Sequence, residues 1–248
     1  MTVKDIFAFL NDFADVNTAL SYDNVGILVG TPEKSVEKAV VCLDVTNEAI
    51  LKAKEVGAQL IISHHPIIFE PLNTVLSDNL VYKCIENDIA VISMHTNLDS
   101  AKGGVNDCLA EALELKKVSV VTDSEGFSFR KGALQKEMLP FELAEYIKGC
   151  LGGSVRYLDS KKPIKTVCVC GGSGGSELDL AKDSADALIT ADVKHSVFIK
   201  ASNIDYPIFD AGHFNTENVL INPLTDLLSK KFSQIEFTAF NDTKIKTL

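Results

Sequence analysis

No stretch of the sequence reaches the roughly 18 uninterrupted apolar residues that a membrane-spanning helix needs. The first residues, MTVKDIFAFLNDFADVN, mix acids into an apolar pattern and lack the basic start, apolar run and small-residue cleavage site of a signal peptide. These absences predict a cytoplasmic protein without a membrane partner.

Basic residues are in the minority, with 24 Lys and Arg against 34 Asp and Glu, so the formal net charge is -10. A chain of this charge repels the phosphate backbone at long range, which argues against binding to extended nucleic acids. A small nucleotide held by metal ions remains compatible with the composition.

The six cysteines form no C-x-x-C pair, which excludes the usual zinc-finger and thioredoxin patterns. Several lie inside apolar runs such as AVVCLDV and TVCVCGG. We therefore predict reduced, buried thiols that pack as small hydrophobic side chains.

Other catalytic motifs are also missing. The chain has no H-E-x-x-H and no G-x-S-x-G, so neither a thermolysin-like protease nor a serine hydrolase is supported. Residues 170–179, CGGSGGSELD, lack the Gly-Lys-Ser/Thr of a P-loop and the G-x-G-x-x-G register of a dinucleotide site. Two interpretations of this segment remain, an anion cradle and a tight turn with positive φ. Metal-activated water is the nucleophile that the sequence supports.

The pattern that is present is an alternation of helices and strands. An amphipathic helix opens the chain, and a short strand follows at VGILVG. The strand AVVCLDV, a helix from Thr46 to Gly57 and the strand QLIIS then form a predicted parallel βαβ unit. The fold class is therefore α/β.

This βαβ pattern recurs as the strand KTVCVCGG, the helix SELDLAKDSAD and the strand ALITAD, which aligns Ile62 with Ile189 at an offset of 127 residues. We predict an internal duplication within a single unit of 1–248, with similar lobes over about 1–125 and 126–248 and the metal site between them. A helix near Gly104, a less regular stretch over 118–136 and a helix in FELAEYIKGCLGG connect the two copies.

All five histidines lie at or just after the carboxyl end of a predicted strand, where open α/β sheets bind their ligands. His64 and His65 follow QLIIS directly and precede Pro66, which bends the chain out of the strand. Because neighbouring side chains at a strand end diverge, this pair suits two metal ions better than one.

Two further motifs each pair an imidazole with a carboxylate four residues later, His95 with Asp99 in SMHTNLDS and His213 with Glu217 in AGHFNTEN. Imidazole and carboxylate ligands suit zinc, manganese, iron, cobalt or nickel, and a carboxylate can bridge two ions. We predict two divalent metal ions per chain, with Asp99 and Glu217 as bridging candidates.

A single histidine is more often structural than functional, so the prediction rests on the whole constellation. The predicted metal ligands are His64, His65, Asp99, His213 and Glu217. His95 and His195 are candidates for catalytic proton transfer or for hydrogen bonding to a ligand, with a purely structural role as the alternative.

These residues resemble a known family. SHHPIIF, SMHTNLDSAKGGVND and DAGHFNTE, with YDNVGILVG near the start, are similar to the YbgI/Nif-three-like dinuclear-metal proteins, often called GTP cyclohydrolase I type 2 homologues. The resemblance extends from about Asp23 to about Glu217. One departure is Tyr22, where many relatives carry Trp, and we expect aromatic packing to be kept there.

The resemblance implies that the same five residues bind metal. It also implies two interlocked α/β/α lobes with mixed sheets and a toroidal homohexamer. The family's activity name implies a metal-dependent hydrolase of the GTP cyclohydrolase type, in which metal-activated water attacks a small-molecule substrate that is a nucleotide or resembles a phosphoester. Fold similarity does not settle the substrate. The alternative hypothesis is a non-catalytic metal-binding oligomer or a regulatory protein that binds a partner.

Overall fold

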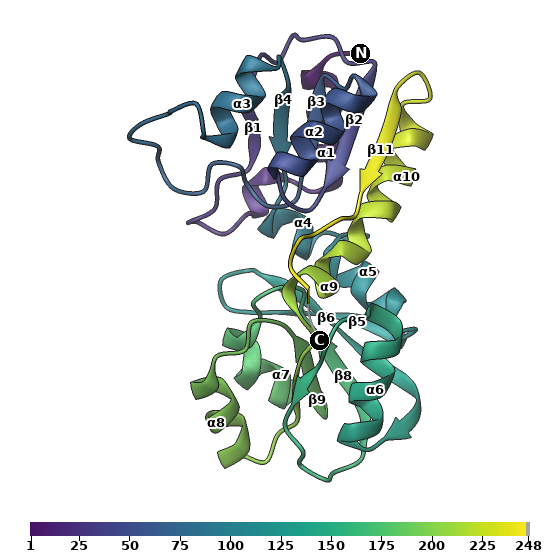
Figure 1. The fold of residues 1–248 in the computed structure, drawn as a ribbon. Helices are drawn as coiled ribbons and strands as arrows, with labels where there is room; N and C mark the ends of the chain where they lie inside the picture. Colours follow the sequence, from purple (N-terminus) through teal and green to yellow (C-terminus); the bar gives the residue numbers. More distant parts are fainter. Residues whose placement is uncertain (247–248) are drawn as a thin grey trace. The chain divides into compact units, whose positions relative to one another are not determined.

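The computed structural model describes residues 1–246, which form two compact units (Figure 1). The first unit comprises Met1–Lys102 and Ile221–Asp242, and the second comprises Gly103–Leu220 and the tail from Thr243. The division after Lys102 comes earlier than the lobe boundary near 125 that the sequence suggested. Residues 221–242 rejoin the first unit, so that unit is discontinuous in sequence.

The first unit contains a five-stranded sheet in the order β1-β4-β3-β2-β11. β2, β3, β4 and β11 pair in parallel, whereas β1 runs antiparallel to β4. The strands are β1 (Gly26–Val29), β2 (Lys38–Cys42), β3 (Leu60–Ser63), β4 (Ala90–Ser93) and β11 (Glu236–Phe240). The α-helices are α1 (Val3–Phe13), α2 (Asn47–Val56), α3 (Leu80–Glu86), α4 (Thr96–Ser100) and α10 (Ile221–Lys231).

The second unit contains a six-stranded sheet in the order β5-β6-β8-β9-β10-β7. β8, β9 and β10 are parallel, and the other pairings are antiparallel. The strands are β5 (Lys116–Thr122), β6 (Ser128–Met138), β7 (Arg156–Tyr157), β8 (Ile164–Val169), β9 (Ala187–Thr190) and β10 (Ile208–Asp210). The α-helices are α5 (Val105–Ala112), α6 (Pro140–Leu151), α7 (Leu178–Ser184), α8 (His195–Asn203) and α9 (His213–Glu217).

Both sheets are mixed, which confirms the predicted fold class, and their topologies repeat one another. β3 and β9 occupy the segments that the sequence alignment matched at the offset of 127 residues. In each sheet three parallel strands are neighbours in chain order, β2-β3-β4 in the first and β8-β9-β10 in the second. An antiparallel strand pairs with the third strand of each set, β1 with β4 and β7 with β10. The shared arrangement agrees with the predicted duplication.

Local sequence signals set the helix ends. The Thr2 hydroxyl accepts a hydrogen bond from the Asp5 backbone N–H, and the Asp5 carboxylate accepts one from Thr2, which forms a capping box at the start of α1. Thr46 caps α2, and Gly57 ends it with φ of 72°. The sequence predicted both ends of α2 correctly.

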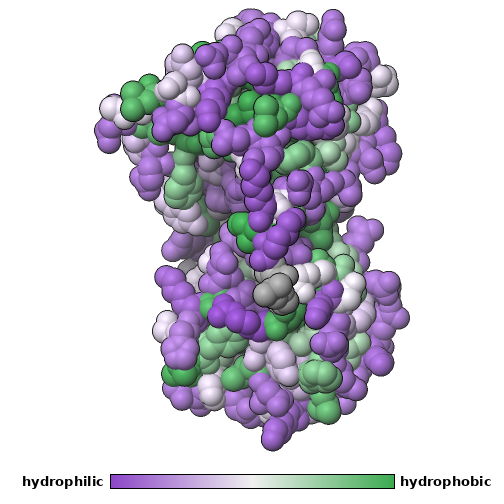
Figure 2. Space-filling model, in the orientation of Figure 1, coloured by the Kyte–Doolittle hydropathy of each residue, from purple (hydrophilic) through white to green (hydrophobic). Residues whose placement is uncertain are grey.

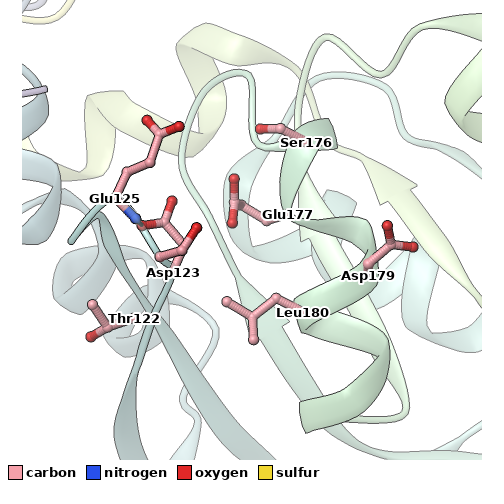
Figure 3. A pocket seen from close by; sticks show the side chains of 8 residues that line it. Thr122, Asp123, Glu125, Ser176, Glu177, Asp179 and Leu180 are labelled. Atoms are coloured by element: carbon pink, nitrogen blue, oxygen red, sulfur yellow. Dashed lines mark hydrogen bonds between the residues drawn. The ribbon is translucent and has the colours of Figure 1, made fainter. Parts of the chain in front are cut away.

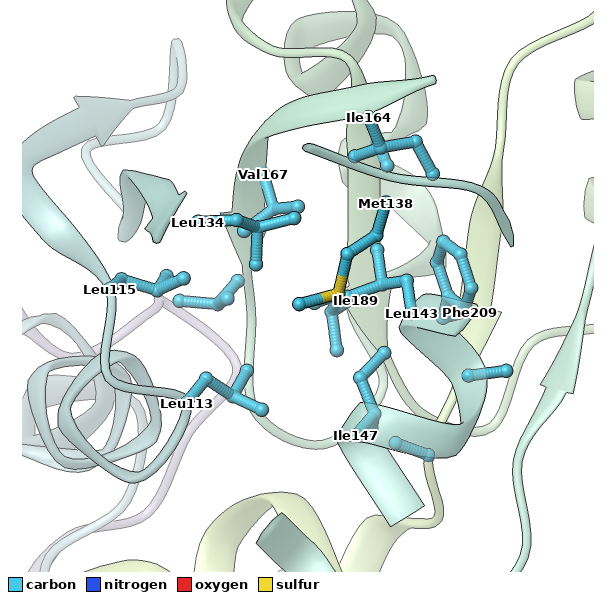
Figure 4. Packing of buried hydrophobic residues seen from close by; sticks show 14 of the residues in the cluster. Leu113, Leu115, Leu134, Met138, Leu143, Ile147, Ile164, Val167, Ile189 and Phe209 are labelled. Carbon is cyan, nitrogen blue, oxygen red and sulfur yellow. The ribbon is translucent and has the colours of Figure 1, made fainter. Parts of the chain in front are cut away.

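Apolar side chains on both faces of each sheet form the cores. In the second unit, α5 and α6 pack on one face over residues such as Ile164, Ile189 and Phe209 (Figure 4). α7 and α8 pack on the other face, over Cys168 and Leu188 among others. The central strands are therefore buried on both sides, which explains their continuous apolar sequences.

The predicted irregular stretch over 118–136 is wrong. Most of it belongs to the antiparallel strands β5 and β6. β5 is an edge strand whose side chains are almost all exposed, so the alternation of apolar and polar residues that marks a half-buried strand is weak. Pairing with β6 makes it a strand, and this pairing is not visible in local sequence. α10 and β11, which form after Glu217, were not predicted from the sequence.

Among the described residues, no helix is both long and apolar enough to cross a bilayer. Hydrophilic residues cover much of the face shown in Figure 2, with apolar residues scattered among them.

The cysteines fulfil the prediction of buried, reduced thiols, with one exception. All six are free, and all are buried except Cys150, which is exposed. Burial raises the pKa of the Cys168 thiol to about 12, so this residue remains protonated at neutral pH. Cys168 also belongs to none of the candidate metal-binding groups found among residues 1–246.

Replacing Phe209 by Ala should destabilise the second unit by about 3–5 kcal/mol, because the fully buried ring would leave a cavity. The matched control is Phe141→Ala, since this phenylalanine on α6 is 62% exposed. Urea unfolding followed by circular dichroism should show a lower midpoint only for the Phe209 variant. Equal midpoints would contradict the assigned core.

Candidate metal centre

His64 and His65 continue the line of β3 at its carboxyl end. Their backbone N–H groups donate to the carbonyls of Cys42 and Leu43, at 3.1 and 2.9 Å, which extends the pairing with β2 past the last strand residue. The His64 side chain is buried, whereas that of His65 is half-buried. These backbone hydrogen bonds therefore hold the main chain of His64 and His65 in place at the end of the sheet.

His95 joins this pair from the end of the neighbouring strand β4. Its ring centroid lies 5.2 Å from that of His64 and 5.5 Å from that of His65, and the latter two are 5.0 Å apart. One nitrogen from each of the three rings lies within 4.8 Å of the other two. The first unit therefore brings three of the sequence-predicted side chains into one cluster.

An oxygen atom accepts a hydrogen bond from Nδ1 of each of these rings. The acceptors are the Met94 carbonyl for His64 at 2.9 Å, the Asp44 carboxylate for His65 at 2.7 Å and the Asp23 carboxylate for His95 at 2.8 Å. A carbonyl or carboxylate oxygen can only accept, so Nδ1 carries the proton and Nε2 carries the lone pair. This is the arrangement that orients histidine ligands in metal sites.

Asp99 faces the same cluster from α4. This helix starts directly after His95, and one turn later the Asp99 Oδ1 atom lies 3.5 Å from Nε2 of His64. Two ligands of one tetrahedral ion with bonds of about 2.1 Å are about 3.4 Å apart. The separation of His64 and Asp99 therefore suits ligation of a common ion.

Asp23 is an ionised carboxylate beneath His95. Burial alone would raise its pKa, but hydrogen bonds from His95 and Thr96 outweigh that effect and hold the pKa well below its usual range. Thr96 donates to Asp23 through both its backbone N–H and its hydroxyl, at 3.0 and 2.6 Å. Asp23 thus keeps the His95 ring in one orientation.

The second unit carries a set of donors with the same chemistry. His213 begins α9 just after β10, and Glu217 follows one helical turn later with a buried side chain. The Asp192 carboxylate accepts a hydrogen bond from His213 Nδ1 at 2.7 Å, and His213 Nε2 lies 3.0 Å from Glu217 Oε2. His213 and Glu217 are therefore positioned to share one ion.

The glycine-rich segment after β8 makes room for Glu217. Gly172 has φ of +60°, and a Cβ atom there would lie 2.1 Å from Glu217 Oε1 and 3.2 Å from His213 Nε2. The Thr216 hydroxyl and the Asn106 side chain accept the N–H groups of Gly172 and Gly171, at 3.1 and 2.8 Å. Of the two interpretations that the sequence left open, this geometry supports the tight turn.

The carboxylates that orient the rings were not among the sequence-predicted site residues. Asp44 and Asp192 each lie 21 residues before the histidine that they bind. Each also follows the end of a strand that pairs in parallel with the strand before that histidine. Acids placed after neighbouring parallel strands were the signal that could have identified them.

His195 is not a member of these sets. It is exposed as the first residue of α8, and it belongs to none of the candidate metal-binding groups found among residues 1–246. Its role in proton transfer stays a prediction.

A different pocket in the second unit has a volume of about 430 Å³ and contains no histidine (Figure 3). Burial raises the pKa of its Glu177, and the carboxylates of Asp123 and Glu125 add to that effect while Ser176 opposes it. The lining residues are Thr122, Asp123, Ser124, Glu125, Ser176, Glu177, Asp179 and Leu180. None of the sequence-predicted site residues lines it.

The donor sets fit a metal centre. Oriented imidazole nitrogens beside buried carboxylates are the ligands that first-row divalent cations prefer. Each unit supplies such ligands on short segments that follow parallel strands.

Comparison with known proteins identifies the family. The sequence model of the Duf34/NIF3 (NGG1p interacting factor 3) family matches residues 1–245. This chain belongs to that family. A protein of Clostridium perfringens named GTP cyclohydrolase 1 type 2 homolog is 38% identical to this chain, and the comparison covers 98% of each chain. The family membership confirms the resemblance read from the sequence motifs.

Solved structures agree with this assignment. The hypothetical protein SA1388 of Staphylococcus aureus has a TM-score of 0.92 at 27% identity, with 100% of this chain and 99% of that chain covered. Reduced HcgD from Methanocaldococcus jannaschii has a TM-score of 0.84 at 28% identity, with 96% and 97% covered. The Duf34/NIF3 fold is thus shared along nearly the whole chain.

Replacing Gly172 by Ala should lower the metal content of the protein, because the added methyl group would displace the Glu217 carboxylate. Gly149→Ala is the matched control, since a Cβ atom there meets nothing within 4 Å. Elemental analysis after purification without chelator measures the difference. Full metal content in the Gly172 variant would contradict the close approach described above.

Replacing Asp192 by Ala should weaken metal binding about 10- to 100-fold, because His213 would lose the hydrogen bond that orients its ring. Asp179→Ala is the control, since that exposed aspartate binds Lys200 instead. Competition with a fluorescent chelator reports the affinity. The assigned role of Asp192 does not survive if the two variants bind metal equally well.

Proposed function

We propose that this Duf34/NIF3 protein is a metal-dependent hydrolase with two divalent ions bound through His64, His65, Asp99, His213 and Glu217. One observation carries the proposal: in both units the Nδ1 atom of each candidate histidine ligand donates to a carbonyl or carboxylate oxygen. Imidazoles whose Nδ1 atoms are held in this way, with Nε2 left to bind an ion, are expected of a metal centre.

When bound, divalent ions lower the pKa of coordinated water towards neutrality and polarise a substrate oxygen or imine nitrogen. Zinc, iron, manganese, cobalt and nickel all accept imidazole and carboxylate ligands, so each is a candidate for the two ions. Five protein ligands for two ions leave coordination positions for water and substrate, as catalytic sites require.

The remaining groups assist the proposed reaction. His95 lies beside His64 and His65, and its ring is held by ionised Asp23, so it is placed to move a proton at Nε2. His195 is retained as a second candidate for proton transfer. Carboxylates at Asp99 and Glu217 complete the ligand set and offset the charge of the ions.

The name of the Clostridium perfringens relative supports a substrate of the GTP cyclohydrolase type, a nucleotide whose purine ring is opened by water. Phosphoester hydrolysis uses the same metal chemistry and is the second reaction class to test. We also propose that the protein acts in the cytoplasm and assembles into a homohexamer. Light scattering of the purified protein would measure the number of chains in the assembly.

The test of the proposal is elemental analysis of untagged protein purified without chelator. The wild type should hold close to two ions per chain, and the His64→Ala, His65→Ala double variant should lose metal. Cys168→Ala is the control, because its buried, protonated thiol should leave metal content unchanged. A wild type that stays metal-free after reconstitution would overturn the proposal and favour a non-catalytic role.

Glu217→Gln should lose at least one ion and reduce hydrolysis of GTP or phosphoesters by more than about 100-fold, the upper effect of losing an outer hydrogen-bond partner. The fold should remain intact, because Glu217 lies on the short helix α9 rather than in a sheet. Circular dichroism checks the fold, and product release measured by chromatography checks the activity. Full metal content and activity in this variant would exclude Glu217 as a ligand.

A further inference from the structure

Two exposed aromatic side chains contact each other in the first unit. Tyr22 is 62% exposed and Phe69 is 45% exposed, and their ring centroids are 6.3 Å apart at an interplanar angle of 66°. They come from loops far apart in sequence. Large aromatic rings are seldom left together in water unless the surface has a use.

A hydrogen bond ties the two loops together. The side-chain amide of Asn24 donates to the carbonyl of Ile68 at 2.6 Å. Each bonded residue lies next to or near one of the rings, so the loop backbones are held where Tyr22 and Phe69 meet. The contact between Tyr22 and Phe69 is therefore stabilised by the backbone of both loops.

The aromatic pair adjoins the imidazole cluster. The Phe69 ring lies 6.2 Å from the His95 ring at an angle of 84°, and His95 in turn contacts His64 and His65. Tyr22 precedes Asp23, the carboxylate that orients His95. A continuous series of rings thus leads from the candidate metal ligands to the exposed Tyr22.

The Tyr22 and Phe69 rings carry no nitrogen that could coordinate a transition metal as an imidazole does, so we look for a use in their exposed apolar faces. These faces offer stacking to any planar ring, whereas a plain phosphoester or an aliphatic substrate would gain little from them. The exposed aromatic pair therefore favours purine-ring opening over hydrolysis of a plain phosphoester, two reactions that the metal chemistry supports equally well.

We propose that Tyr22 and Phe69 form a stacking platform for a planar heteroaromatic ring, which they hold beside the imidazoles of His64, His65 and His95. The inference rests on the proposed function and narrows its substrate to a compound bearing such a ring. Tyr22 and Phe69 are binding residues and take no part in proton transfer.

The experiment compares three probes with a common ribose phosphate: guanosine monophosphate, nicotinamide mononucleotide and ribose 5-phosphate. Isothermal titration calorimetry of the full-length, metal-loaded protein should show tighter binding of at least one ring-bearing probe than of ribose 5-phosphate. Tyr22→Ala and Phe69→Ala should each weaken that binding about 5- to 100-fold without changing the affinity for ribose 5-phosphate. Tyr22→Phe should retain the preference because it keeps the ring.

Ile85→Ala is the matched control, since this side chain on α3 is 60% exposed but has no part in the ring series. The inference is overturned if neither nucleotide binds more tightly than ribose 5-phosphate, or if both alanine variants keep the preference. It is also overturned if Tyr22→Ala changes only the oligomeric state in light scattering, because the pair would then join copies of the chain.

Metal content measured on the same samples separates this inference from the proposed function. Loss of the ring preference with metal content unchanged is the expected result for both alanine variants. A metal-loaded wild type without ring preference would refute the platform and leave the metal centre standing. A wild type without metal would refute the metal centre, and the same titrations would still decide whether the rings bind.

Discussion

The arrangement of the candidate site depends on one interaction, the hydrogen bond from histidine Nδ1 to an oxygen atom. His64 donates to the Met94 carbonyl, and His65, His95 and His213 donate to Asp44, Asp23 and Asp192. Each bond fixes the tautomer as well as the ring orientation, so that Nε2 carries the lone pair. Without these bonds the rings would rotate and could present a protonated nitrogen, and neither unit would offer a prepared set of ligands.

The parallel strands supply the positions for these bonds. Because the carboxyl ends of parallel strands lie along one edge of a sheet, residues that follow different strands become neighbours. In the first unit this places Asp44, after β2, against His65, after β3. In the second unit it places Asp192, after β9, against His213, after β10. The duplicated topology thus produces the same acid and imidazole pairing twice, with a separation of 21 residues each time.

Close packing around Glu217 imposes a second constraint, because it requires a residue without a side chain at position 172. Gly172 combines a positive φ with a position where any side chain would collide with the carboxylate. Its N–H donates to the hydroxyl of Thr216, the residue before Glu217, and its carbonyl accepts from the buried Thr190 hydroxyl at 2.9 Å. Because leaving a buried polar group without its partner costs about 1–3 kcal/mol, these hydrogen bonds stabilise the turn. The glycine-rich segment therefore supports the carboxylate rather than a phosphate group.

Helix caps, apolar runs and short motifs are local signals, so the α/β class, the duplicated βαβ pattern, the ends of α2 and the candidate ligands were all predictable from the sequence. The pairing of β5 with β6 and the place of 221–242 in the first unit were not predictable in this way, since both depend on contacts with segments distant in sequence. For the same reason the sequence did not predict that Asp23, Asp44 and Asp192 orient the histidine rings. Each acquires its function from a histidine that lies 21 or 72 residues away and becomes its neighbour only when the sheet has formed.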